Sequence, residues 1–163
     1  MHDQKLISDY LRKCFISVDG LWFMKVEQGA DFEKALELDI EVWKVLPKIE
    51  ARTIQELLGL GKGMPALRHA LEFKLSAEDS RFELSAFGQD SFTLEVRDCS
   101  WVAHIRKANQ EQFLERISES ICSVEFGTFA SEFGSDISVE HDCSSCRSKG
   151  GCRLVFKDPG RLS

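Results

Sequence analysis

Residues 81–97 read RFELSAFGQDSFTLEVR, and this stretch decides the fold class. Phe82 and Leu84 alternate with polar or charged residues, and Phe92, Leu94 and Val96 do so again after a loop that contains glycine. A period of two is typical of a half-buried strand, and two such strands around a short loop predict an antiparallel hairpin.

The same alternation returns near the end of the chain, in residues 137–141 and 152–156. It predicts a second hairpin. The loop that joins these two strands, residues 142–152, contains three cysteines and two adjacent glycines. We therefore expect a cysteine-rich hairpin loop at one end of the sheet.

Apolar residues at steps of three and four predict amphipathic helices in the remaining segments, over residues 3–28, 32–46, 65–75 and 110–133, with a short one from Trp101. Pro47 lacks an amide donor, so it is expected to break or kink the second run, after which helical spacing resumes as far as Leu58. Alternation from Leu71 to Leu75 would also allow a strand.

The order of helices, hairpin, long helix and hairpin predicts the architecture of the whole chain. It predicts a single α+β domain over residues 1–163, with helices on one face of an antiparallel sheet. Gly20 lies inside the first predicted helix, where glycine costs about 1 kcal/mol relative to alanine and allows a local kink.

Composition narrows the class of protein. The chain has 163 residues and 27 acidic against 21 basic side chains, a formal net charge of -6. This balance speaks against nucleic acid or an anionic membrane surface as a partner. No apolar run is long enough to span a bilayer, and the residues after Met1 lack the apolar core of a signal peptide. We therefore expect a soluble, cytoplasmic protein.

Six cysteines are the anomaly in this composition. Thiols stay reduced in the cytoplasm, so metal binding or thiol chemistry is favoured over a disulfide framework. Cys143 and Cys146 are separated by two residues, a spacing that lets both sulfurs of one turn point at the same ion. Cys152 follows a glycine pair and can fold back onto that ion. These three residues are predicted metal ligands.

Three residues are candidates for the fourth ligand of this predicted site. Cys99 is our first choice because it lies where a strand ends and a helix begins, so helix amides would favour its thiolate. Cys122 and His141 are the alternatives. Zinc is the favoured metal because four such ligands close a tetrahedral site, and an iron–sulfur cluster is the alternative. The alternatives to any metal are a reduced loop with incidental cysteines and a redox disulfide.

A second candidate site lies in the predicted helices. Four polar residues and two tryptophans could line a pocket that has apolar walls and few polar anchors. These predicted ligand-binding residues are Asp19, Trp22, Glu27, Asp39, Trp43 and Arg52. The competing interpretation is structural: both tryptophans lie on apolar stripes and would be core residues, while the two aspartates would be solvated or cap helices.

Several motifs are spread along the sequence, namely residues 18–23, Val26-Glu27, residues 32–36, Asp39, Val42-Trp43, Cys99 before Trp101, Cys122, and Cys152-Arg153-Leu154-Val155-Phe156. On these motifs, most of the chain resembles a family of uncharacterised prokaryotic cytosolic proteins. That family is similar to the 4-vinyl-reductase-type small-ligand domains and to the aminothiazoline-carboxylate hydrolases. The resemblance implies an α+β fold with a four-stranded antiparallel sheet covered by helices, and a cysteine-bound metal.

Three functions are compatible with these features. The first and favoured one is a small-molecule-binding or sensing domain with a cysteine-bound metal. The second is a metal- or thiol-dependent hydrolase. The third is a dimeric accessory or scaffold protein without a ligand of its own. A homodimer is compatible with all three, because the helices carry a surplus of apolar faces.

Overall fold

The structure, a computed structural model, describes residues 3–88 and 90–161, without the side chains at 147 and 161. Gln89, in the predicted turn of the first hairpin, lies outside the described residues. Four strands form one antiparallel sheet in the order β1-β2-β4-β3. They are β1 (Arg81–Ser85), β2 (Ser91–Asp98), β3 (Ser138–Asp142) and β4 (Cys152–Lys157). Both predicted hairpins are confirmed.

The sheet is buried on one face. Leu94 of β2 lies between Leu84 of β1 and Leu154 of β4, and it is fully buried. On the opposite face Arg97 pairs with Glu83 across β1 and β2. The period of two in the sequence therefore matches the two environments of the sheet.

The helices before the sheet begin and end close to the predicted positions. They are α1 (Gln4–Gly29), α2 (Phe32–Trp43), α3 (Leu46–Leu58) and α4 (Met64–Ala77). Pro47 occupies the first turn of α3, where no amide donor is needed, so the predicted break is confirmed. The alternative strand at Leu71 to Leu75 is wrong, because both residues lie four apart on the buried face of α4.

The predicted long helix over 110–133 is a run of short helical segments that ends at Ser131. These are η1 (Glu111–Phe113), α6 (Leu114–Ile117), η2 (Ser118–Cys122) and α7 (Ser123–Ser131). The middle segment η2 is a π-helical turn, a geometry that is frequent at functional sites. The remaining elements are α5 (Ser100–Lys107), α8 (Cys146–Lys149) and η3 (Pro159–Arg161).

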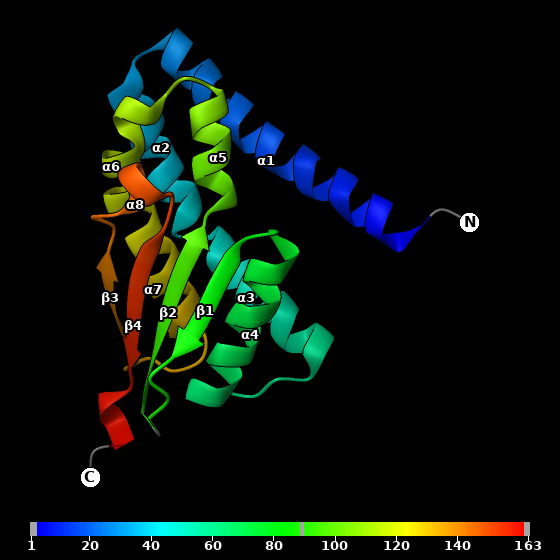
Figure 1. The fold of residues 1–163 in the computed structure, drawn as a ribbon, viewed down its shortest axis with the longest axis vertical. Helices are drawn as coiled ribbons and strands as arrows, with labels where there is room; N and C mark the ends of the chain where they lie inside the picture. Colours follow the sequence, from blue (N-terminus) through cyan, green and yellow to red (C-terminus); the bar gives the residue numbers. More distant parts are fainter. Residues whose placement is uncertain (1–2, 89, 162–163) are drawn as a thin grey trace.

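The helices divide into two groups (Figure 1). Helices α3, α4 and α7 cover one face of the sheet and bury the main core, which includes Phe129 and Phe156. Helices α2, α5 and α6 gather at one end of the sheet with α1, around a smaller cluster that contains Trp43 and Ile121. The chain is therefore an α+β protein, as predicted.

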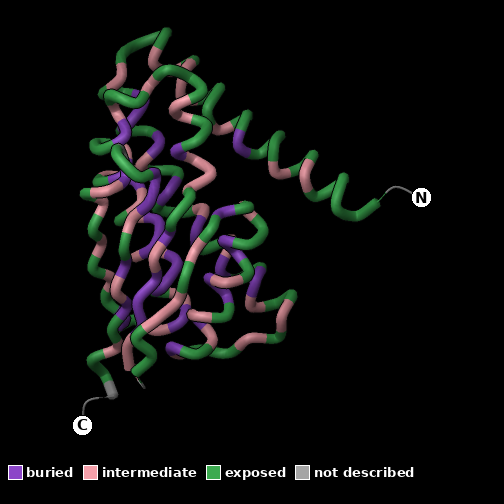
Figure 2. Tube along the Cα trace, viewed as in Figure 1, coloured by how far each residue is buried: buried purple, intermediate pink, exposed green. Residues whose placement is uncertain are grey.

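Helix α1 differs from the others because much of its apolar stripe is uncovered. Its N-terminal half projects away from the sheet and is almost entirely exposed (Figure 2). Across residues 3–88 and 90–161, no helix combines the length and the apolar character that crossing a membrane requires.

Candidate functional site

A cavity of about 180 Å³ lies among α1, α2, α5, η2, α7 and the adjoining end of the sheet. We call it the helical cavity. Aromatic and aliphatic side chains form most of its wall, with a few acidic groups and thiols set among them. The apolar part of the wall includes Ile16, Phe23, Trp43, Trp101, Ile105 and Phe126.

Gly20 explains how α1 leaves room for this cavity. Ile16, Gly20 and Phe23 line it from one face of α1, as their spacing in a helix requires. A Cβ atom added at Gly20 would have no other atom within 4 Å. The glycine inside the first helix, an unfavourable residue for helix formation, therefore borders open space.

Two carboxyl groups face the helical cavity from neighbouring helices, Asp19 from α1 and Asp39 from α2. Asp39 is only 8% exposed. Burial raises the pKa of Asp19 to about 6. Burial, and then repulsion by Asp19, raise the pKa of Asp39 to about 7, against a hydrogen bond from Trp43 that lowers it. Among the described residues, neither carboxylate forms an ion pair.

Two tryptophans form an aromatic corner of the cavity. The rings of Trp43 and Trp101 meet edge to face, with centroids 5.8 Å apart. The ring nitrogen of Trp101 is buried and has no hydrogen-bond partner within the described part of the chain. Trp43 is buried in the helical cluster, as the core interpretation of this residue expected, and it also lines the cavity.

Three of the six predicted ligand-binding residues, Asp19, Asp39 and Trp43, line the cavity. Trp22 does not: it is 58% exposed, so its interpretation as a core residue is wrong. It follows Gly20 by two residues, which places it about 200° around the helix, on the side away from the cavity. Glu27 lies on α1 beyond the segment that borders the cavity.

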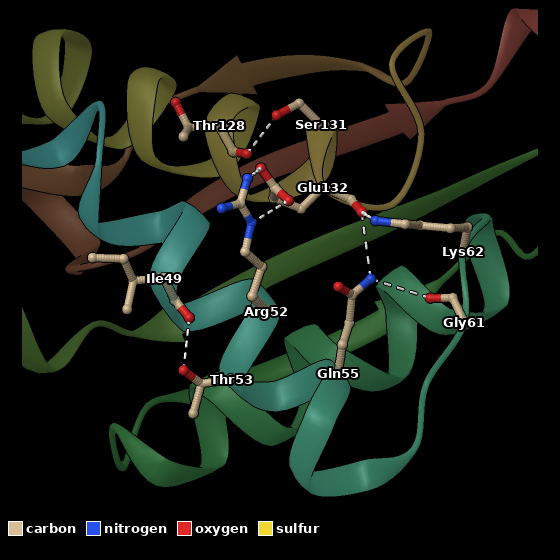
Figure 3. Close-up of polar contacts among 9 residues, drawn as sticks. All are labelled: Ile49, Arg52, Thr53, Gln55, Gly61, Lys62, Thr128, Ser131 and Glu132. Atoms are coloured by element: carbon tan, nitrogen blue, oxygen red, sulfur yellow. Dashed lines mark hydrogen bonds and ion pairs between the residues drawn. The ribbon is translucent and has the colours of Figure 1, made fainter.

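Arg52 is on α3 and holds two elements together instead of lining the cavity (Figure 3). Its Nε and Nη2 atoms donate to the two carboxylate oxygens of Glu132 at 2.9 and 3.0 Å, just after α7 ends. Lys62 also donates to the backbone carbonyl of Glu132. The structure gives Arg52 a structural contact at the surface.

The predicted metal ligands come together at one end of the sheet. Because β2 and β4 are antiparallel, the end of β2 meets the start of β4, where Val96 pairs with Cys152. Just beyond β2, the backbone N–H of Cys99 donates to the carbonyl of Gly150 at 2.9 Å. The N–H of Cys146 donates to the carbonyl of Cys143 at 2.8 Å, which forms the turn before α8.

Cys122 joins this group from η2. Cys99, Cys122 and Cys152 all line the helical cavity, while Cys99 and Cys143 pack against the buried Cys146. We call these five residues the thiol cluster. No three His, Cys, Asp or Glu side chains in residues 3–88 and 90–161 are arranged so that they could hold a metal ion.

Three thiols of this cluster, those of Cys99, Cys122 and Cys152, are held in the neutral form. Burial, and then the neighbouring thiols and Glu125, raise the pKa of Cys152 to about 12 and that of Cys122 well above the ordinary value. Burial also raises the pKa of Cys99 to about 11. The buried Ser118 hydroxyl lies beside Cys122 and Cys143, and its contact with each thiol opposes the rise in pKa that burial causes.

His141, the other candidate ligand, lies on β3. Its Nδ1 atom is 3.1 Å from the hydroxyl of Ser123, and burial lowers its pKa. Its Nε2 atom is buried without a hydrogen-bond partner among the described residues.

The sequence did not reveal an ionic network that borders the cavity. Lys74 of α4 is only 3% exposed, and its Nζ atom lies 2.8 Å from Glu50, 2.5 Å from Glu78 and 3.1 Å from Glu125. Burial would lower the pKa of Lys74, but the effect of the three carboxylates is larger, so the pKa is raised well above its ordinary value. Burial raises the pKa of Glu125 to about 7 despite Lys74.

One signal for this network was present in the sequence. Glu125 lies four residues after Ile121 and four before Phe129, so it occupies an apolar stripe where a charged residue needs a partner. Glu78 and Glu125 both line the helical cavity, so the network forms part of its wall.

Comparison with known proteins gives a family match. No curated protein matches the chain. A family model, described as a family of unknown function (DUF6125), matches residues 3–151. Neither result bears on the resemblance to the 4-vinyl-reductase-type domains or the hydrolases, which stays a prediction. Because the match spans most of its length, the chain belongs to the family of unknown function DUF6125.

Proposed function

We propose that this protein is a small-molecule-binding domain and that the helical cavity holds its ligand. One observation carries this proposal: a cavity of about 180 Å³ has mostly apolar walls and two carboxyl groups, Asp19 and Asp39, within them. Ligand sites commonly combine apolar walls with a few polar groups that fix orientation. A cavity of about 150 Å³ accommodates benzene, so a ligand with one aromatic ring fits.

We also propose that the thiol cluster binds zinc, with Cys99, Cys143, Cys146 and Cys152 as ligands. Binding would require these side chains to turn toward one ion, because no three of the described side chains are so arranged in this structure. Support comes from the donor set, since cysteines from the end of β2, the loop after β3 and the start of β4 meet at one end of the sheet. Zinc would hold these thiols as thiolates and would stabilise that end of the sheet. All six cysteines are free thiols, which supports a location in the cytoplasm.

A hydrolase is the second candidate, and one observation favours it. Glu125, with a pKa raised to about 7, lines the same cavity as Cys99 and Cys152 and could exchange a proton near neutral pH. A thiol nucleophile, however, needs a low pKa, whereas burial raises the pKa of Cys99 to about 11. Ligand binding is therefore the better supported function.

We propose that the exposed face of α1 binds a second copy of this chain. The helix exposes eight large apolar side chains, Leu6, Ile7, Tyr10, Leu11, Phe15, Val18, Leu21 and Trp22. At roughly 100 Å² each they offer about 800 Å² per copy, the area of a standard interface. Sedimentation equilibrium should show a dimer that Val18→Glu dissociates, and a monomeric wild type would contradict this proposal.

Thermal unfolding with small probes tests the ligand-binding proposal. We expect benzylamine, benzyl alcohol or phenylacetate at millimolar concentration to raise the Tm, because a ligand that binds only the folded state stabilises it. Gly20→Phe should abolish the shift, because the new ring enters the cavity, and Gly20→Ala should keep it. An unchanged Tm with all three probes, or an equal shift in Gly20→Phe, would overturn the proposal.

A further inference from the structure

Asp19 and Asp39 form a carboxyl pair for which the described protein supplies no counter-charge. They lie on different helices, and both line the helical cavity. The only hydrogen bond to Asp39 comes from Trp43, and no cationic side chain acts on either carboxylate among the described residues. Buried carboxylates are stable as anions only when a cation or several donors accompany them.

The same protein shows how one buried and two partly buried carboxylates are balanced elsewhere. Glu50, Glu78 and Glu125 surround one ammonium group, that of Lys74, at 2.5–3.1 Å. An ammonium group thus stabilises three acidic side chains in an interior close to the cavity. The carboxyl pair of Asp19 and Asp39 differs because it faces a cavity instead of a lysine.

The aromatic corner beside this pair suits a cation as well. Tryptophan is the side chain that attracts cations most strongly through its ring face, and Trp43 and Trp101 both line the cavity. The buried ring N–H of Trp101 lacks a partner within the described residues and can donate to an acceptor on a ligand. The wall therefore offers two indoles, one free indole donor, the imidazole of His104 and four carboxyl groups. Glu78 and Glu125 are paired with Lys74, whereas Asp19 and Asp39 have no such partner among the described residues.

Resting on the proposed function, we infer that the ligand of the helical cavity is a small organic cation. Its ammonium group lies between Asp19 and Asp39, and its apolar or aromatic body packs against Trp43 and Trp101. A cavity of about 180 Å³ admits one ring with a short aminoalkyl chain. The pKa values of both aspartates, raised by burial, agree with this inference because a bound cation would favour the ionised carboxylates.

Three probes of similar size and different charge test this inference by titration calorimetry at neutral pH. Benzylamine is a cation, benzyl alcohol is neutral, and phenylacetate is an anion. We expect benzylamine to bind roughly tenfold or more tightly than benzyl alcohol, because its charge interacts with both carboxylates. Phenylacetate should bind most weakly.

Charge-neutral variants locate the source of this preference. Asp39→Asn and Asp19→Asn should each reduce the affinity for benzylamine while the affinity for benzyl alcohol changes little. Asp98→Asn is the matched control, since it removes the same charge from an exposed residue that is outside the cavity. Two separate variants keep the test valid if one of them fails to fold.

The outcomes separate this inference from the proposed function. If benzyl alcohol or phenylacetate binds as tightly as benzylamine, the inference is overturned, and a proton shared by the two aspartates balances the pair instead. The proposed function stands in that case. An equal loss in Asp98→Asn would also overturn the inference. If no probe binds, both are overturned.

Discussion

The carboxyl group of Asp39 on α2 lies close enough to that of Asp19 on α1 for the charge of Asp19 to raise the pKa of Asp39. Both groups border the helical cavity. Two like charges in a mostly apolar wall reduce the stability of the folded protein whenever both are ionised. A stability cost that is retained at a cavity is typical of a binding site.

This relationship predicts the pH dependence of folding. The pKa of Asp39 is about 7 in the folded protein and near 3.8 in the unfolded chain, so the folded state holds this proton more tightly. The stability that the folded state gains from this bound proton is therefore fully present below pH 4 and is lost as the pH rises through about 7. The free energy of unfolding of Asp39→Asn should exceed that of the wild type, and the difference should grow from pH 4 to pH 8.

The size of that difference follows from the shift. We expect Asp39→Asn to gain on the order of 2–4 kcal/mol relative to the wild type between these pH values. Urea unfolding at each pH measures it, and Asp98→Asn, at an exposed position, serves as the control. A difference that does not change with pH would contradict the raised pKa of Asp39.

The buried ammonium of Lys74 predicts a large loss of stability in Lys74→Met. This change leaves Glu50, Glu78 and Glu125 without their common cation, and removing one partner of a buried pair costs about 3–5 kcal/mol. Lys34→Met removes an exposed pair with Glu37 and should cost less than about 1 kcal/mol. Equal losses in the two variants, measured by urea unfolding, would show that the network contributes little.

The proposed zinc site predicts a change in metal content. The purified wild type should contain about one zinc ion per chain, and Cys146→Ser should lose the metal and unfold at a lower temperature. Cys14→Ser is the matched control because Cys14 is exposed on α1. Elemental analysis and thermal unfolding measure both effects.

The same measurement identifies the fourth ligand. Cys99→Ser should behave like Cys146→Ser, while Cys122→Ser should keep its zinc. The reverse result would assign the role to Cys122. Full zinc content in Cys146→Ser would remove that residue from the site.

Gly151 predicts a strict requirement for glycine where β2 meets β4. A Cβ atom there would overlap the carbonyl oxygen of Val96 and approach its carbonyl carbon to 3.1 Å. Because backbone cannot move aside cheaply, Gly151→Ala should lose roughly 3 kcal/mol or more. Gly61→Ala is the control, since a Cβ at Gly61 meets nothing within 4 Å. Similar stability of the two variants would contradict the close approach.

The fold was predictable from the sequence because its signals are local. Alternation around Leu94 and Leu154 matches a sheet with one buried face, and Pro47 marks the start of α3. Such patterns depend on the periods of strands and helices, which neighbouring residues along the chain reveal.

The site was predictable only in part because it depends on contacts between distant elements. Asp19, Asp39 and Trp43 line the cavity, as the pocket hypothesis required. Trp22 belongs to the apolar stripe that the sequence predicts for the first helix, but it lies on the exposed side of α1. Glu125 was missed because its partner, Lys74, is on another helix. The periodicity of the sequence does not specify which apolar helix face is left uncovered by the other elements.

The most direct measurement of ligand binding at the helical cavity is an NMR titration that follows the indole N–H signals. The chain has three tryptophans: Trp43 and Trp101 line the cavity, while Trp22 is exposed and serves as an internal reference. With benzylamine, benzyl alcohol and phenylacetate added in turn, at least one probe should shift the signals of Trp43 and Trp101 and leave that of Trp22 in place. If all three probes leave Trp43 and Trp101 unchanged, or if Trp22 shifts as much as they do, the cavity is not the binding site.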